Sequence, residues 1–264
     1  KYNSMFLKVI IIFGLLIICS VYAYSIAPVS QWDSYHQFSD SRTLFFIENF
    51  SNVASNIGFF VFGSYGVFRI FRDNVFDSKL DLIPYFLFFL SVIFVGLGST
   101  YYHLRPTTET LFWDRLPMSI SFMSFFSAVV CDRINRTAGI FFVLPILTLV
   151  GIYSVVYWQN TEAMGAGDLR LYGLVQYFPM LAIPILLFLF PRYKYTVPGS
   201  ILWVLGCYVF AKLFEYFDLN VLTLSGGYLS GHTIKHIMAS IAVICVLRML
   251  TVSRRERFLT DVNQ

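Results

Sequence analysis

Three of the four histidines in this chain lie in two short polar segments that interrupt long apolar runs. The first segment, GLGSTYYHLRPTTETLFWD, contains Ser99, His103 and Asp114, and the second, SGHTIKH, contains His232 and His236. Residues four apart share one face of a helix, which applies to the Ser–His pair and to the His–His pair. Polar groups in hydrocarbon cost free energy unless they are paired or used, so these residues indicate a functional site.

The three histidines and the acid have the composition of a catalytic zinc site. Zinc binds imidazole nitrogens, and HxxxH on one helix face is a spacing of metal-binding pairs. His103, His232 and His236 would supply three neutral nitrogens and leave one tetrahedral position open for water. We expect Asp114 to act as the general acid and base, and Ser99 to donate to an oxyanion. The alternative is that these side chains only join helices by hydrogen bonds.

The composition is that of a polytopic membrane protein. The 264 residues are 57% hydrophobic and 13% charged, whereas a soluble domain carries about 25% charged residues. Most of the length is needed for membrane-spanning helices, so no room remains for a separate soluble domain. The net charge of +4 comes mainly from the ends of loops, and we do not expect a nucleic acid partner.

Eight apolar runs are long enough to cross a bilayer, which requires about 20 residues. They lie near residues 5–27, 49–71, 82–103, 111–131, 138–157, 171–190, 199–217 and 231–250. No alternating pattern of ten-residue strands is present, so we expect an all-α membrane protein.

The first run precedes the segment that contains the candidate site. We expect three parts: an N-terminal transmembrane anchor or signal-like helix at 1–30, a membrane domain at 31–250 and a basic cytoplasmic tail at 251–264. Pro28 directly follows Ala27, a candidate cleavage residue, which favours an uncleaved anchor.

Basic residues predict the orientation. They follow the second, fourth and sixth runs and the last one, as Arg69, Arg72, Lys79, Arg133, Arg136, Arg192, Lys194, Arg248, Arg254, Arg255 and Arg257. If all eight runs span, these residues lie on one side, and the positive-inside rule places the C-terminus in the cytoplasm. His103, Asp114 and His232 then all lie near the extracytoplasmic side, which supports a shared site.

A further group of polar residues has a structural interpretation. Lys212, Glu215 and Asp218 share one helix face, and we expect a structural salt-bridge network that includes Lys235.

The loop before the second run contains Asp33, His36, Asp40 and Arg42. We expect a solvated loop with an Asp–Arg pair, with a lid or a cation site as the alternative. Asn52 and Asn56 share a face of the second run, and would either support the metal ligands or bond neighbouring helices.

The combined motifs resemble the alkaline ceramidase family. The motifs on which this resemblance rests are SxxxH followed by a P-x(7)-D turn, and then SGHTxKH near the C-terminus. The resemblance extends over roughly residues 33–250, and ENFSNVASN at 48–56 is similar to the start of the family's first helix. WDSYHQFSDSRTLF is similar to bacterial members. The family belongs to a wider group of seven-helix zinc hydrolases that includes the adiponectin receptors.

The resemblance implies a seven-transmembrane-helix bundle, to which the first run adds one N-terminal helix. It implies zinc on His103, His232 and His236, Asp114 as the proton shuttle and Ser99 near the oxyanion. The implied reaction is hydrolysis of a lipid amide, such as ceramide, to a fatty acid and an amine.

Calcium is left open by the same resemblance. Eukaryotic members have a calcium site with an acidic motif, which residues 31–42 do not reproduce. Asn49 stands where a family carboxylate would be.

We therefore expect an intramembrane zinc amidase that acts on ceramide-like or other N-acyl lipids, in the inner membrane of a bacterium. An ester-lipid hydrolase or remodeller on the same zinc site is the first alternative, and a zinc-stabilised lipid receptor without turnover is the second. The expected partners are the lipid substrate and the bilayer, with no oligomeric state assigned.

Overall fold

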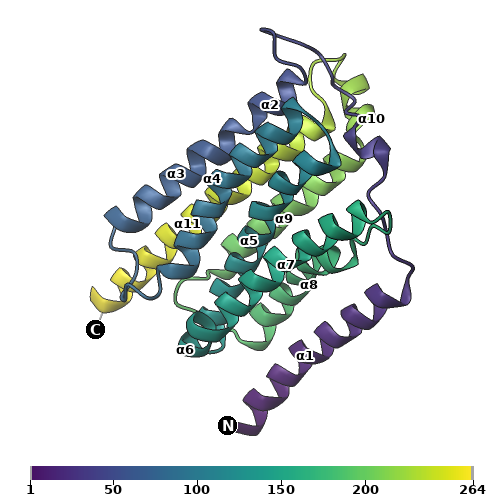
Figure 1. Cartoon of the computed structure of the whole chain (residues 1–264). Helices are drawn as coiled ribbons and strands as arrows, with labels where there is room; N and C mark the ends of the chain where they lie inside the picture. The colour runs from purple at the N-terminus through teal and green to yellow at the C-terminus, as the bar shows by residue number, and fades with distance from the viewer. Residues whose placement is uncertain (1, 263–264) are drawn as a thin grey trace.

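Helices form most of the chain in the computed structural model, which describes residues 2–262 and the side chains of 5–259 (Figure 1). The elements are α1 (Tyr2–Ser25), η1 (Asp33–His36), α2 (Phe50–Ser55), α3 (Ile57–Arg72), α4 (Ile83–Leu104), α5 (Thr108–Arg133), α6 (Arg136–Ala138), η2 (Gly139–Val143), α7 (Leu144–Ala163), α8 (Arg170–Leu189), α9 (Pro198–Tyr216), α10 (Asp218–Leu224) and α11 (Gly231–Val262). Between residues 2 and 262 no strand forms beyond one isolated bridge. The all-α prediction is confirmed.

Seven helical segments among the described residues are long and apolar enough to cross a membrane, and the chain is an integral membrane protein. They are Met5–Ser25, Phe50–Arg72, Ile83–Leu104, Arg136–Ala163, Arg170–Leu189, Pro198–Tyr216 and Gly231–Leu259. α5 is an eighth long helix of 26 residues, and its serines and charged residues make it less apolar than the others. These helices coincide closely with the eight predicted runs. The main difference is α11, which continues as a helix to Val262, within the segment predicted as a tail.

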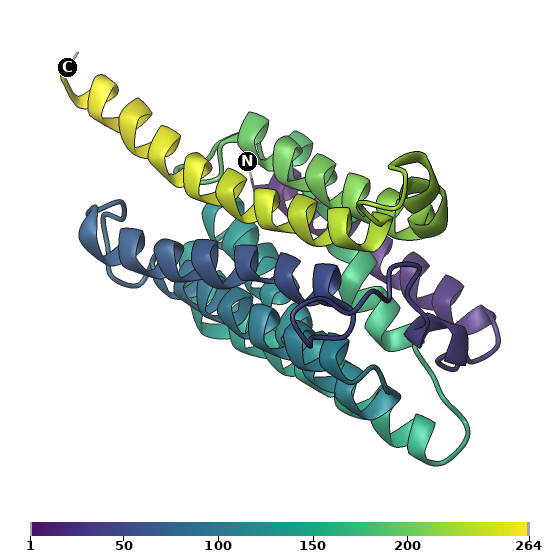
Figure 2. The ribbon, with the colours of Figure 1, turned by 90° about the horizontal axis from the view of Figure 1, so that it is seen from above.

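The bundle is arranged around α5 and α11, which bring the two polar segments to one end. α5 packs against α4, α7 and α8. Figure 2 shows α11 between α9 on one side and α3 and α4 on the other. The core is apolar, with Phe89, Val129 and Leu186 among its fully buried side chains. This packing holds α4, α5 and α11 in fixed register.

α1 is the additional N-terminal helix, and it lies at the edge of the bundle beside α8 (Figure 1). Most of its large apolar side chains are exposed, as expected for a helix that faces lipid. Lys8 fixes one of its ends, because its Nζ donates to the carbonyl oxygen of Leu189 at 2.7 Å.

At the end of the bundle that contains α6, buried and half-buried charges are paired. The Asp132 carboxylate accepts hydrogen bonds from the backbone N–H groups of Lys194, Tyr195 and Thr196, the last at 2.8 Å. Arg133 is buried and donates to the carbonyl oxygen of Phe190 at 2.8 Å and to the Thr196 hydroxyl at 3.0 Å. These bonds fix the α8–α9 loop against α5.

Candidate metal centre

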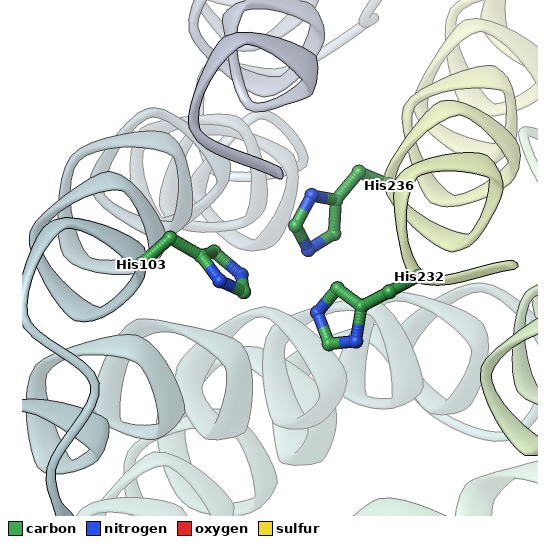
Figure 3. A group of neighbouring side chains, drawn as sticks. All are labelled: His103, His232 and His236. Carbon is green, nitrogen blue, oxygen red and sulfur yellow. The ribbon is translucent and has the colours of Figure 1, made fainter. Parts of the chain in front are cut away.

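His103 of α4 and His232 and His236 of α11 meet at the opposite end of the bundle (Figure 3). Their ring centroids lie 4.9 Å apart for His103 and His232, 5.0 Å for His103 and His236, and 4.9 Å for His232 and His236. One nitrogen from each ring lies within 4.8 Å of the others. All three side chains are buried, at 1%, 6% and 3% exposure respectively. The predicted histidines therefore form one compact group.

The nitrogen atoms of this group fit a metal ion. His103 Nδ1 and His232 Nε2 are buried without a hydrogen-bond partner, which is costly for a polar atom. His236 Nδ1 lies 2.8 Å from the Ser55 hydroxyl, which orients the ring and leaves Nε2 as its available ligand atom. A metal ion would satisfy the orphaned nitrogens. In metal sites, the ring nitrogen of a histidine that does not bind the metal is typically hydrogen-bonded, as Nδ1 of His236 is here.

The start of α11 positions His232 and His236. The Asp218 carboxylate accepts a hydrogen bond from the backbone N–H of His232 at 2.7 Å, which satisfies one free donor of the first turn. Gly231 permits a close approach to α9, because a Cβ at this position would lie 2.0 Å from the carbonyl oxygen of Phe214. His103 lies near the end of α4, and its carbonyl oxygen accepts a hydrogen bond from Asn49 Nδ2 at 2.9 Å.

Ser99 and Asp114 lie opposite each other where α4 crosses α5. Both are buried, at 2% and 8% exposure, and the Ser99 hydroxyl lies beside the Asp114 carboxylate. The helices come this close because residue 98 is glycine: a Cβ on Gly98 would lie 1.9 Å from the carbonyl oxygen of Trp113. The structure thus brings the predicted acid on α5 beside the predicted serine on α4, the helix that also carries His103.

The segment between α1 and α2 covers the histidines. The Phe38 ring lies 4.6 Å from the His103 ring and 5.0 Å from the His232 ring, measured between centroids. The backbone N–H of Ser39 donates to Asp218 at 3.1 Å, which ties this segment to the start of α11.

The Asp40–Arg42 pair that the sequence predicted is present in the same segment. Arg42 Nε and Nη2 each donate to the Asp40 carboxylate at 2.7 Å. The predicted solvated loop is wrong for Asp40, which is only 2% exposed, because the segment folds back against α2. The Arg42 hydrogen bonds lower the pKa of Asp40 below its usual range and outweigh the opposing effect of burial.

His36 also contacts the bundle. Its Nδ1 lies 3.0 Å from the Tyr102 hydroxyl and its Nε2 lies 3.1 Å from the Thr108 hydroxyl. Burial lowers the pKa of His36, with a smaller contribution from Arg115 in the same direction. His36 therefore lies outside the metal-binding group and fastens the covering segment to α4 and α5.

The predicted ion network is confirmed in part. Glu215 pairs with Lys212 and, at 2.9 Å, with Lys235. Asp218 lies outside this network, since its carboxylate is used by Ser39 and His232.

Asn52 links the covering segment to α11. Its Oδ1 accepts from the Thr233 hydroxyl at 3.0 Å, and its Nδ2 lies 3.3 Å from the carbonyl oxygen of Asp40. Asn56 is buried and donates to the carbonyl oxygen of Asn52 at 3.0 Å. These asparagines join helices and loops around the histidines.

Two residues beside the histidines were missed by sequence reasoning. Ser55 lies among polar residues at the start of a membrane-spanning segment, and that position was an available signal. Phe38 had none, because it is one of 29 phenylalanines and its place over the histidines depends on how the segment folds.

Comparison with known families gives one result. The sequence model of the family described as Ceramidase matches residues 42–185, more than half of the chain. The match contains Ser99, His103 and Asp114 and ends before His232 and His236. No curated protein matches the sequence. The structure supplies what the match does not reach, since α11 brings its two histidines to His103.

Proposed function

The chain belongs to the ceramidase family, and we propose that it is an intramembrane zinc-dependent hydrolase that cleaves the amide bond of ceramide-like or other N-acyl lipids. The family supports a lipid amidohydrolase. The observation that carries the proposal is the group of three buried imidazoles, two of which have a ring nitrogen without a partner. A site built only to join helices would have satisfied these atoms.

His103, His232 and His236 would hold the zinc ion. Three neutral histidines are a ligand set of catalytic zinc sites, which keep a further position for water or substrate. When bound, zinc acts as a Lewis acid that polarises a carbonyl group and makes water more acidic.

Asp114 is assigned to proton transfer. Its carboxylate is buried on α5 beside Ser99 and is separate from the group of histidines that could hold the metal. In amide hydrolysis, water adds to the carbonyl carbon, the C–N bond breaks and the amine nitrogen gains a proton. Asp114 takes the proton from water and returns it to the leaving amine.

Ser99 is assigned to the developing oxyanion. Its hydroxyl lies beside the Asp114 carboxylate, and because it has one proton to donate, it would turn from the carboxylate to the oxyanion as negative charge develops.

The test is release of fatty acid by purified protein from matched N-acyl and O-acyl lipids, with zinc content measured in parallel. We expect amide cleavage that a chelator abolishes and zinc restores. Asp114→Asn keeps the size and hydrogen bonding of the side chain but removes the base. It should retain zinc and lose about 10²–10⁴-fold in rate, the usual contribution of a general acid–base group.

The possible failures are distinct. Cleavage of esters alone would change the substrate class, and no turnover by zinc-loaded protein on either panel would favour a receptor. Loss of zinc from Asp114→Asn would make Asp114 a ligand or its support rather than a base.

We further propose that the C-terminus is cytoplasmic and the histidines lie near the extracytoplasmic side. α6 and the C-terminus lie at one end of the bundle, and α2 and α10 at the other (Figure 1). Basic side chains gather at the first of these ends, among them Arg69, Arg72, Arg133 and Arg136. Reporter fusions at the C-terminus and within residues 105–109 should report opposite compartments. The same compartment for both would contradict the orientation.

A further inference from the structure

A tight turn before α2 exposes three consecutive apolar side chains. Leu44 is 44% exposed, Phe45 is 81% exposed and Phe46 is fully exposed. Their exposure differs from that of Phe38, which lies over the histidines in the same segment. Contiguous large apolar side chains at a surface indicate a binding partner or a membrane.

The conformation of the turn is defined. Leu44 and Ile47 exchange backbone hydrogen bonds of 3.2 and 3.0 Å. Phe45 and Phe46 between them have φ angles of +54° and +64°, a left-handed conformation that bulky residues rarely adopt. Exposing two phenylalanines from a strained backbone is unfavourable in water, so an apolar environment around the rings would compensate for it.

Both ends of the turn are fastened to the site end of the bundle. Before it, Arg42 pairs with the buried Asp40 and donates to the carbonyl oxygen of Tyr228 at 2.9 Å. After it, Asn49 bonds the carbonyl oxygen of His103. The two phenylalanines are therefore presented at a fixed place and not on a loose loop.

The turn lies where a membrane-spanning segment begins, and such a place is expected at the border of a membrane. The turn ends two residues before Asn49, and the membrane-spanning segment Phe50–Arg72 follows directly. Figure 1 shows this part of the chain projecting beside α2 at the edge of the bundle. Aromatic side chains at such a border insert into the headgroup region of lipids.

We propose that the turn Leu44–Ile47 is a membrane-contact element that inserts Phe45 and Phe46 into the lipid surface at the end of the bundle containing the histidines. The partner is a lipid headgroup layer and its first acyl carbons. The inference goes beyond the proposed function and does not depend on it, because no bound metal or turnover enters the argument.

The test uses a fluorescent label on single cysteines. The four native cysteines, Cys19, Cys131, Cys207 and Cys245, are first replaced by alanine. Phe46→Cys is the test position and Ser41→Cys is the matched control, because Ser41 is exposed and polar and lies in the same segment. Both labelled proteins are placed in phosphatidylcholine nanodiscs with spin-labelled lipids, after circular dichroism has verified their helical content.

We expect the label at position 46 to be quenched several-fold more by lipid with a shallow spin label than the label at position 41. It should also be protected from an aqueous quencher. If Phe46→Cys does not fold, Phe45→Cys takes its place, because it projects from the same turn.

Three outcomes would overturn the proposal. Strong aqueous quenching at position 46 without lipid quenching would place the turn in water. Energy transfer between chains carrying donor and acceptor labels at this position would assign the phenylalanines to a second copy of the chain. Equal lipid quenching at positions 41 and 46 would remove the specific role of the two rings.

Discussion

The two ends of the bundle both bury polar side chains, but among the described residues only one end brings metal-binding side chains together and leaves ring nitrogens of that group without partners. At the end containing α6, Asp132 and Arg133 bond the backbone of the α8–α9 loop. At the end containing α2 and α10, His103 and His232 each keep a buried ring nitrogen that has no partner. Burial is similar at both places, since Arg133 is 6% and His232 is 6% exposed.

This difference distinguishes buried polar residues that stabilise the fold from those that could bind a ligand. A buried polar group with a full set of partners stabilises the native state and needs no ligand. A buried polar group without partners destabilises the fold unless something else binds it. The histidines are therefore interpreted as metal ligands, and Asp132 as a residue that stabilises the fold.

We expect the largest effect from replacing one buried polar residue at each end of the bundle with alanine. His232→Ala should remove bound zinc and abolish hydrolysis, because two imidazoles are too few for the proposed site. Asp132→Ala should leave zinc content and rate per folded molecule unchanged but lower thermal stability, since three backbone N–H groups lose their acceptor. Elemental analysis and thermal unfolding in detergent measure the two properties on the same samples. Loss of zinc from both variants would remove the distinction between the ends.

Ser99→Ala sharpens the comparison within the site end. The three histidines that could hold a metal are unchanged in this variant, so zinc content should stay at the wild-type level. The hydrolysis rate should fall about 10²–10³-fold if the hydroxyl stabilises the oxyanion. A wild-type rate in zinc-loaded Ser99→Ala would show that the contact of Ser99 with Asp114 is only structural.

Gly98→Ala tests the position of Asp114 without changing any polar group. The new methyl group would meet the carbonyl oxygen of Trp113, so α5 must shift away from α4. A displacement of about 1 Å can lower a rate about 10²-fold. Gly206→Ala in α9 is the control, because nothing lies within 4 Å of its Cβ position. Equal rates for the two variants would contradict this positioning role.

We expect the smallest effect at the Asp40–Arg42 pair, whose side chains have hydrogen-bond partners, as Asp132 and Arg133 have at the opposite end. The pKa of Asp40 is lower in the folded state, so the pair contributes stability fully above about pH 4, the ordinary aspartate pKa. This contribution is lost as the pH falls through the lowered folded pKa. Asp40→Asn should therefore unfold at a lower temperature than wild type at pH 6, with the difference shrinking toward pH 3. A constant difference over this range would exclude the pair as its cause.

Local sequence patterns predicted much of this site, and non-local packing decided the rest. The spacing of His232 and His236 is set by the α-helix itself, and apolar runs placed His103 at the same depth. Phe38 and Ser55 were not predicted as contacts of the histidines, because those contacts depend on a loop and a helix from other parts of the chain. The approach of Asp114 to Ser99 depends on Gly98, whose significance appears only when the facing helix is known.

The origin of the histidines in α4 and α11 has a consequence for biogenesis. α11 follows every other helix of the described chain, so ribosomes and the insertion machinery deliver His232 and His236 after all those helices. A nascent chain that ends before Gly231 has only one of the three imidazoles. We therefore expect metal loading to follow synthesis of the last span, which would make zinc uptake a marker of completed assembly. Zinc bound stoichiometrically by a purified fragment that stops before Gly231 would contradict this order of events.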